Sequence, residues 1–392
     1  MSAHAGAHPY RATRPDDDSQ AGLKLFAVFL GLAVGVLISV VIWMGASAQD
    51  ARNDARHAAA NGGSSAMATS MPGMDMSSAQ GAVATPSFAG TSPANADALA
   101  AAHRPFPAEL PAVAPGPVAN LQLELTHRVI SIAPGIRYEA WTFDGGAPGP
   151  VIHVRQGQLV RVTIKNDAPM PHSIDFHAAR VAPNVAFADV MPGKSFSFTF
   201  RANDPGVFMY HCGTKPVLAH ISNGMYGAIV VDPKDATLLP PVHHAYVIVS
   251  GEWYLNAPGD KAPAALDMVK ARQMTPDWVT WNGYAGQYVK HPFEAHPGHT
   301  TRFYVVDAGP SFDTDFHVVG TVLQRAWVNG DVVDPPQHGI QTATVPAGGS
   351  GIFDVTIAKP GLYPFVTHSF ASVDMGAVGL LNVGDVAGTM SH

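Results

Sequence analysis

The sequence has little of two things on which many proteins depend, cysteine and charge. Among 392 residues there is one cysteine, so the chain forms no internal disulfide and its cysteine count says nothing about redox compartment. Charged residues make up 14 % of the chain, the formal net charge is −7 and no run of lysine or arginine occurs, which argues against nucleic acid as a partner. Glycine (38 residues) and proline (33 residues) are abundant instead, and this composition favours a turn-rich β protein.

Charge is missing altogether from residues 25–46. About 20 apolar residues let a helix cross a bilayer, and Trp43 stands near one end, where an interfacial aromatic belongs. We therefore predict a transmembrane helix over 25–46 after a cytoplasmic segment, 1–24. The alternative is a cleaved signal peptide, for which Ala46-Ser47-Ala48 resembles a cleavage site, although the apolar part of a signal usually runs only about 7–15 residues. Either way the main body is exported, and we expect it in the bacterial periplasm, anchored to the inner membrane or soluble after cleavage.

Residues 47–116 are rich in Ala, Ser, Gly, Pro and Asn and have almost no large apolar side chains. Such a segment buries too little apolar surface to offset the entropy of ordering, so we predict a flexible, disordered tether. Methionine recurs four times within Met67–Met76. Thioethers are soft ligands that favour Cu(I), so this stretch is either a weak copper-capture site or part of a linker with no such role.

From about Val118 the texture changes to short β-rich runs separated by turn residues. Leu121–Leu125, Leu159–Ile164 and Ser195–Phe200 alternate between apolar and polar residues, as half-buried strands do. The two halves of this region echo each other, since each has Pro-Gly, an aromatic strand, a histidine, a loop, a methionine and an apolar strand. We predict an all-β protein with two tandem Greek-key β-sandwich domains, 117–238 and 239–386, and a short tail, 387–392.

The single cysteine lies in a loop that carries other metal-binding side chains. Cys212 is followed by His220 after seven intervening residues and by Met225 after four more. A thiolate, an imidazole and a weak thioether, completed by a distant imidazole for which His172 is the candidate, are the ligands of a blue-copper electron-transfer site. The simpler interpretation is a buried, inert cysteine beside core histidine and methionine residues.

Neighbouring polar residues point to a second site. On a strand, Asp175 and His177 share a face while His172 lies on the other, and the adjacent residues His211 and Cys212 also face oppositely. His177 and His211, with a third imidazole for which His368 of the second domain is the candidate, would leave a metal with an open coordination position, as catalysis requires.

The motifs of residues 118–386 resemble those of the copper-containing nitrite reductases. The segment MPHSIDFHAA resembles the family's first ligand strand, and YHCGTKPVLAHISNGMYG resembles its main ligand loop. The resemblance implies a type 1 copper bound by His172, Cys212, His220 and Met225. It also assigns His177 and His211 to a type 2 copper, with Asp175 as a catalytic residue. The seven-residue gap after the cysteine is similar to that of the shorter-loop branch of the family.

Two segments of the second domain complete the resemblance. FHVVG resembles the segment that bears the catalytic histidine, here His317, with Val319 in the substrate pocket. VTHSF resembles the segment that gives the last type 2 ligand, so His368 of one subunit would complete the site of its neighbour in a homotrimer. The resemblance thus implies cupredoxin-like domains, two coppers per chain, nitrite as substrate, nitric oxide as product, and a small cupredoxin or cytochrome c as electron donor.

Two other functions use similar domains. A multicopper oxidase needs a trinuclear cluster served by His-x-His pairs, whereas here Cys212 is followed by Gly213 and the histidines of the first domain are spaced His-x4-His. A membrane-tethered copper carrier or electron-transfer protein needs only the first ligand set, and the second set of histidines distinguishes it from an enzyme.

Overall fold

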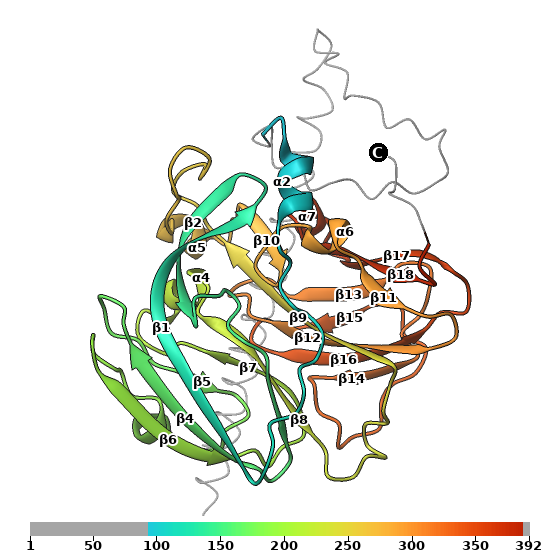
Figure 1. Ribbon diagram of the computed structural model, residues 1–392, viewed down its shortest axis with the longest axis horizontal. Helices are drawn as coiled ribbons and strands as arrows, with labels where there is room; N and C mark the ends of the chain where they lie inside the picture. The colour runs from blue at the N-terminus through green and yellow to red at the C-terminus, as the bar shows by residue number, and fades with distance from the viewer. Residues whose placement is uncertain (1–92, 387–392) are drawn as a thin grey trace, which may run out of the picture. The chain divides into compact units, whose positions relative to one another are not determined.

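The computed structural model describes residues 93–386, and the strands of this part of the chain form four sheets (Figure 1). The predicted cytoplasmic segment (1–24), transmembrane helix (25–46) and tail (387–392), and residues 47–92 of the predicted tether, lie outside the described residues. Among residues 93–386, no helix combines the length and the apolar character needed to cross a membrane.

The first half of the described chain builds two four-stranded sheets. One has the order β2-β1-β4-β6 and consists of β1 (Val118–Ala133), β2 (Ile136–Phe143), β4 (Leu159–Asn166) and β6 (Ser195–Arg201). The other has the order β3-β8-β7-β5 and consists of β3 (Ile152–Arg155), β5 (Asp175–Phe176), β7 (Gly206–His211) and β8 (Tyr226–Asp232). The three alternating segments recognised in the sequence fall within β1, β4 and β6, which confirms them as strands.

The second half builds two five-stranded sheets. The order β10-β9-β12-β16-β14 joins β9 (His244–Trp253), β10 (Trp278–Trp281), β12 (Thr300–Asp307), β14 (Arg325–Val328) and β16 (Ser350–Thr356). The order β11-β18-β17-β13-β15 joins β11 (Phe293–Ala295), β13 (Thr314–Val318), β15 (Ala343–Val345), β17 (Gly361–Thr367) and β18 (Val378–Val383). In each half, residues of both sheets meet in one apolar core, so each half is a β-sandwich, and Figure 1 shows the first half in cyan to green and the second in yellow to red.

Few helices accompany the strands, and all of those described are short. They are α2 (Ala96–Ala102), α3 (Pro183–Ala186), α4 (Val217–Ser222), α5 (Met268–Gln273), α6 (Gln287–Lys290) and α7 (Phe370–Asp374). Two of them occupy equivalent places, because α4 links β7 to β8 and α7 links β17 to β18. The echo between the two halves of the sequence is therefore a repeated strand–helix–strand unit.

Two of the four sheets are covered on both faces. Ile229 and Val231 of β8 pack into the core of the first sandwich, while Ala228 and Val230 of the same strand pack against strands of the second sandwich, such as β9 and β12. A strand buried on both faces reads as a continuous apolar run rather than an alternating one. This explains the run from Ala228 to Val231, and it fixes the two sandwiches against each other through an apolar layer.

The predicted tether ends earlier than the sequence indicates. Residues 95–116 contain α2 and then an extended strap, in which Leu110 N–H donates to Ala245 O at 2.9 Å and Ala108 O accepts from Val247 N–H at 2.7 Å. Ala114 N–H likewise donates to His153 O at 2.8 Å. The assignment of this part to a flexible tether is corrected, because the backbone of the strap satisfies strand edges that would otherwise lack partners, an interaction that side-chain composition does not reveal.

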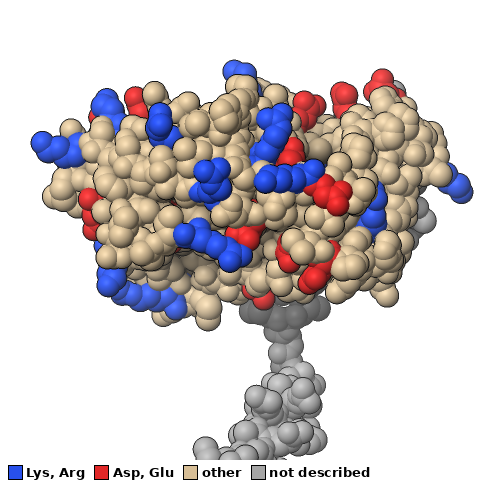
Figure 2. Space-filling model, turned by 90° about the horizontal axis from the view of Figure 1, so that it is seen from below, with Lys and Arg blue, Asp and Glu red and all other residues tan. Residues whose placement is uncertain are grey.

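Charged side chains are scattered among uncharged ones on the face shown in Figure 2. The second sandwich also contains charged side chains that are buried. Arg302 and Arg325 both contact the fully buried Asp354, with N–O distances of 2.7 Å, and both guanidinium groups lie over the ring of Trp327. Asp307, in β12, is also buried, and burial raises the pKa of its carboxyl group well above its usual range.

Candidate metal centre

The loop between β7 and β8 brings three of the predicted ligands together. Cys212 follows the last residue of β7, His220 lies in α4, and Met225 precedes β8. The N–H of Cys212 donates to Met225 O at 3.0 Å, and the N–H of Met225 donates to His220 O at 3.2 Å. These two bonds close the loop on itself, so side chains 8 and 13 residues beyond the cysteine return to it. All three side chains are fully buried.

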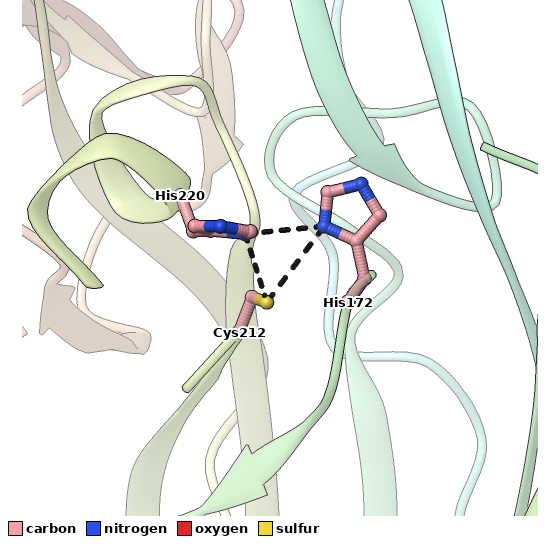
Figure 3. A group of neighbouring side chains, drawn as sticks. All are labelled: His172, Cys212 and His220. Carbon is pink, nitrogen blue, oxygen red and sulfur yellow. Dashed lines mark hydrogen bonds between the residues drawn. The ribbon is translucent and has the colours of Figure 1, made fainter. Parts of the chain in front are cut away.

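His172 lies three residues before β5, the strand that pairs with β7. Its backbone pairs with Val190, with N–O distances of 3.2 and 2.7 Å, and its side chain is fully buried. Figure 3 shows the rings of His172 and His220 and the thiol of Cys212 turned toward one another. The two Nδ1 atoms are 3.1 Å apart, and the sulfur is 3.1 Å from Nδ1 of His220 and 3.9 Å from Nδ1 of His172.

These separations are near those around a metal ion, although the two that involve Nδ1 of His220 are shorter than a bound ion would set. With bonds of about 2.05 Å to nitrogen and about 2.3 Å to sulfur, a trigonal ion would hold the two nitrogens about 3.5 Å apart and each nitrogen about 3.8 Å from the sulfur. Two imidazoles and a thiolate in a trigonal set, with methionine nearby, are the donors of a blue-copper site. Among the residues described, this is the one group of three or more His, Cys, Asp or Glu ligand atoms that all lie within 4.8 Å of one another.

Burial sets the electrostatics of this centre. It lowers the pKa of His172 to about 3, with further contributions from His220 and His127, and it lowers that of His220 to about 4. Both rings are therefore neutral at physiological pH, the form in which imidazole binds metals. Burial also raises the pKa of the Cys212 thiol, while hydrogen bonds from the backbone of Ser173 and from Thr214 act in the opposite direction.

Two residues of the centre have no signal in the sequence. His127 of β1 lies with its Nε2 3.0 Å from Nε2 of His172, and its ring is stacked on Trp141 of β2 at a centroid distance of 5.1 Å. Trp141 also presents its ring to His172 and His220, at centroid distances of 5.5 and 4.8 Å. A metal on Nδ1 of His172 leaves the proton on Nε2, so His127 accepts this hydrogen bond. The pairing of β1 with β2 sets these two rings side by side, and the packing of this hairpin on the ligand loop places them over the ligands.

A second group of predicted residues lies at β5 and the end of β7, on the face that points away from the first ligand set. β5 and β7 pair so that Asp175 is opposite His211, with His177 following β5. Phe176 between them is buried, whereas His177 is exposed. The Nε2 atoms of His177 and His211 are 3.1 Å apart, close to the roughly 3.3 Å expected for two imidazoles on one tetrahedral ion.

The remaining ring nitrogens of this pair are held by the backbone. Nδ1–H of His211 donates to Cys212 O at 3.0 Å. Although His177 is exposed at its edge, desolvation of the ring by the atoms packed around it, followed by the neighbouring His211, lowers its pKa. Asp175 and a hydrogen bond with the backbone of Gly348 oppose that shift. Metal-binding histidines usually donate their second ring N–H to a carbonyl or carboxylate in this way, which leaves Nε2 free for the ion.

His317 and His368 form a separate pair in the second sandwich. Their ring centroids are 5.1 Å apart, and Nδ1–H of His317 donates to Gln341 O at 2.7 Å. Val319, one residue beyond β13, is 40 % exposed. Within the described part of one chain, no third His, Cys, Asp or Glu ligand atom completes either histidine pair within 4.8 Å. One chain thus brings together the first ligand set and leaves the second set as two incomplete pairs.

Known proteins that are similar in sequence to this chain share one description, copper-containing nitrite reductase. A multicopper oxidase family model matches residues 124–236. The chain is 37 % identical to a copper-containing nitrite reductase from Neisseria meningitidis serogroup B over 270 residues, which are 67 % of this chain and 68 % of that protein. It is 29 % identical to the protein of the same description from Pseudomonas chlororaphis over 269 residues, covering 64 % of this chain and 74 % of that one.

Solved structures agree with these relatives. The copper nitrite reductase from Nitrosomonas europaea superposes with a TM-score of 0.64 at 32 % identity, covering 70 % of this chain and 96 % of that chain. A multicopper oxidase superposes with a TM-score of 0.60 at 23 % identity, covering 68 % of this chain and 89 % of the other, a likeness of fold.

Proposed function

The chain belongs to the family of copper-containing nitrite reductases, and on that premise we propose that it reduces nitrite to nitric oxide with one electron at two copper centres per chain. The balanced reaction consumes one nitrite ion, two protons and one electron and yields nitric oxide and water. His172, Cys212, His220 and Met225 would hold a copper that supplies one-electron transfer from a donor, and His177, His211 and a third imidazole would hold a copper that supplies a binding position for nitrite. The residues of the chain hold the two ions, connect them and supply the protons.

One observation carries this proposal: adjacent residues of one strand serve two different ligand groups. Cys212 turns inward to His172 and His220, whereas His211 turns outward, with its Nε2 3.1 Å from that of His177. The peptide unit between Cys212 and His211 is therefore a short covalent connection between the two centres. In addition, the hydrogen bond from the His211 ring to Cys212 O holds that imidazole against the same peptide.

The proton-supplying roles fall to Asp175 and His317. Asp175 lies opposite His211 in the sheet and two residues before His177, so its carboxyl group is on the side of the second centre. His317 donates Nδ1–H to a backbone carbonyl, which orients the ring and leaves Nε2 to exchange a proton with substrate. Val319, exposed at the end of the same segment, would line the substrate pocket.

The second centre requires more than one chain, and we place it between the subunits of a homotrimer. The support is that His177 and His211 form one pair, His317 and His368 form another, and neither pair gains a third ligand within the described chain. His368 of one subunit would complete the site of the next. The assembly is tested by light scattering, where the proposal requires a particle of three times the 41.1 kDa chain mass.

The electron donor we propose is a small cupredoxin or cytochrome c. The first centre lies under Trp141 and His127, which are partly exposed and belong to the outer sheet of the first sandwich. A donor that docks over these rings would reach His220 and His172 without entering the substrate site.

For location, we propose a protein anchored in the inner membrane by residues 25–46, with both sandwiches in the periplasm. The support is the charge-free sequence of that segment. Intact mass of the purified protein tests this against signal cleavage, because an uncleaved chain keeps 41.1 kDa and a cleaved one loses its N-terminus.

Neither alternative function accounts for the ligand groups of the described residues. A copper carrier would need the first centre and leave the four histidines of the two outer pairs without a purpose. An oxygen-reducing multicopper oxidase would need a trinuclear cluster, and the residues described contain no second group of three convergent ligands within one chain.

The deciding experiment is metal analysis with electron paramagnetic resonance, before and after nitrite is added. We expect two coppers per chain and a type 2 signal that nitrite alters. The control is Cys212→Ser, which should remove the blue-copper signal and keep the nitrite-sensitive one. A single copper per chain whose signal ignores nitrite would refute the reductase assignment and indicate a carrier.

A further inference from the structure

Four histidines gather at the surface of the second sandwich, apart from both proposed copper centres. They are His243 and His244, which lead into β9, and His296 and His299, which lie between β11 and β12. We call them the histidine cluster. His243 and His296 are exposed, and His244 and His299 are partly buried, so the cluster is open to solvent on one side.

Backbone hydrogen bonds hold both halves of the cluster in place. The sequence His296-Pro297-Gly298-His299 forms a tight turn, in which His299 N–H donates to His296 O at 3.0 Å and Gly298 has φ of +77°. Proline second and a positive-φ glycine third are typical of a type II turn, which places its first and last side chains close together. Across the sheet, His243 N–H donates to the carbonyl of Thr300 at 3.2 Å.

The spacing of the four rings is similar to that of the copper-site rings. The centroids of His243 and His299 are 3.9 Å apart, those of His244 and His296 are 5.4 Å apart, and those of His296 and His299 are 5.5 Å apart. The two pairs at the proposed copper centres have centroid distances of 5.0 and 5.1 Å. Unlike those of the first centre, the ring nitrogens of the cluster do not all lie within 4.8 Å of one another, so metal binding here requires the exposed rings to rotate toward a common point.

The ring nitrogens of the cluster are not engaged elsewhere. Within residues 93–386, no hydrogen bond to a ring nitrogen of these four residues occurs, whereas His317 and His338 each donate Nδ1–H to a backbone carbonyl. Desolvation and the neighbouring histidines lower the pKa values of His244 and His299, and the nearby carboxylate of Glu109 opposes this for His244. Neutral imidazoles beside a carboxylate are the groups that bind transition metals.

From this arrangement we propose that the histidine cluster binds one divalent transition metal ion per chain, copper(II) most tightly. Imidazole donors suit copper, zinc and nickel, and the Irving–Williams order puts copper(II) first among these ions. The site is separate from both catalytic coppers and takes no part in nitrite reduction. It gives the chain an accessory, solvent-accessible copper site in addition to the two that the reaction uses.

The test uses the full chain brought to two coppers per chain by a chelator wash that empties the solvent-open cluster. Zinc is the probe, because zinc is colourless and undergoes no redox change. Equilibrium dialysis against zinc, with copper and zinc measured in the same sample, gives the extra ions bound per chain. The variant is His243→Gln with His299→Gln, which removes two rings and keeps every backbone bond of the turn. The control is His338→Gln, another exposed imidazole outside the cluster.

We expect the wild type and His338→Gln to bind one zinc per chain without losing copper. The double variant should bind it more weakly by at least roughly tenfold for each imidazole removed. Blue absorbance and nitrite turnover should be equal in all three proteins, so failure of the reductase assignment would not be confused with failure of this site. Equal zinc binding by the wild type and the double variant would refute the proposal, as would the absence of an extra zinc on the wild type. If the double variant is unstable, His296→Gln alone supplies the same comparison.

Discussion

Replacing Asp175 by asparagine is the sharpest test of how the second centre works. The amide has the size of the carboxyl group and should leave β5 intact, because β5 is held to β7 by backbone pairing at Asp175–His211 and Phe176–Tyr210 and by the fully buried ring of Phe176. The ligand rings of His177 and His211 are therefore unchanged. What the amide cannot do is release and regain a proton.

The expected loss of turnover in Asp175→Asn follows from the role of Asp175 as a proton donor. A positioned acid typically contributes about 10²–10⁴-fold to rate, which corresponds to a barrier increase of about 3–5 kcal/mol. We expect Asp175→Asn to lose turnover in this range while it keeps both coppers. A role in binding alone would raise KM and leave kcat near the wild-type value.

The assay combines nitrite turnover from an artificial reductant with copper content and paramagnetic resonance of the same samples. The control is Asp204→Asn, which removes a carboxylate of the same sandwich that pairs with the exposed Arg180. Exposed ion pairs contribute only about 0–1 kcal/mol, so this variant should keep wild-type turnover. If Asp175→Asn turns over nitrite as fast as Asp204→Asn with both coppers bound, the proton-supplying role is wrong.

Three further predictions concern other parts of the molecule. His127→Phe keeps a ring on Trp141 but removes the hydrogen-bond acceptor from Nε2 of His172, which makes His172 a less basic ligand. The reduction potential of the proposed type 1 copper should therefore rise by tens of millivolts, since about 1 kcal/mol is roughly 40 mV for one electron. An unchanged potential in a redox titration would exclude this role. Asp354→Asn leaves two arginines with no buried anion and should lower the free energy of unfolding by about 3–5 kcal/mol in a denaturant titration. Burial raises the pKa of Asp307 above its ordinary 3.8, so between 3.8 and the folded pKa the folded protein binds more protons than the unfolded chain. Its stability should therefore fall as pH rises from 3.8 toward the folded pKa. Thermal melts across this pH range should show a smaller decline for Asp307→Asn.

The strap before β1 shows where composition misleads. Residues 103–116 contain few large apolar side chains. Even so, Ala108 is part of the core of the second sandwich, and the backbone N–H of Leu110 donates to Ala245 O at the start of β9. The stabilising contacts are mainly backbone bonds to a strand edge that β10 does not reach, since β10 pairs only with the last four residues of β9. Hydropathy does not report such pairing, and the boundary of the predicted tether was placed too late for that reason.

The sequence by itself determined the β-sandwich class and the strands with alternating residues, and it predicted the candidate site residues. These depend on local properties: a period of two, turn residues at strand ends, and donor types at fixed spacing around Cys212. The opposite facing of Cys212 and His211 also follows locally, since neighbouring side chains on a strand point to opposite faces.

The tertiary structure alone decided what lies around those residues. It placed His127 and Trp141 over the first ligand set. The β1–β2 hairpin brings these two rings together locally, but their position over His172, 45 residues beyond His127, depends on how the fold packs. It also separated His177 and His211 from His317 and His368, and joined His243 to His299 across β9 and β12. Each of these contacts depends on how strands from distant segments pack, which is a property of the whole fold rather than of any stretch of the chain.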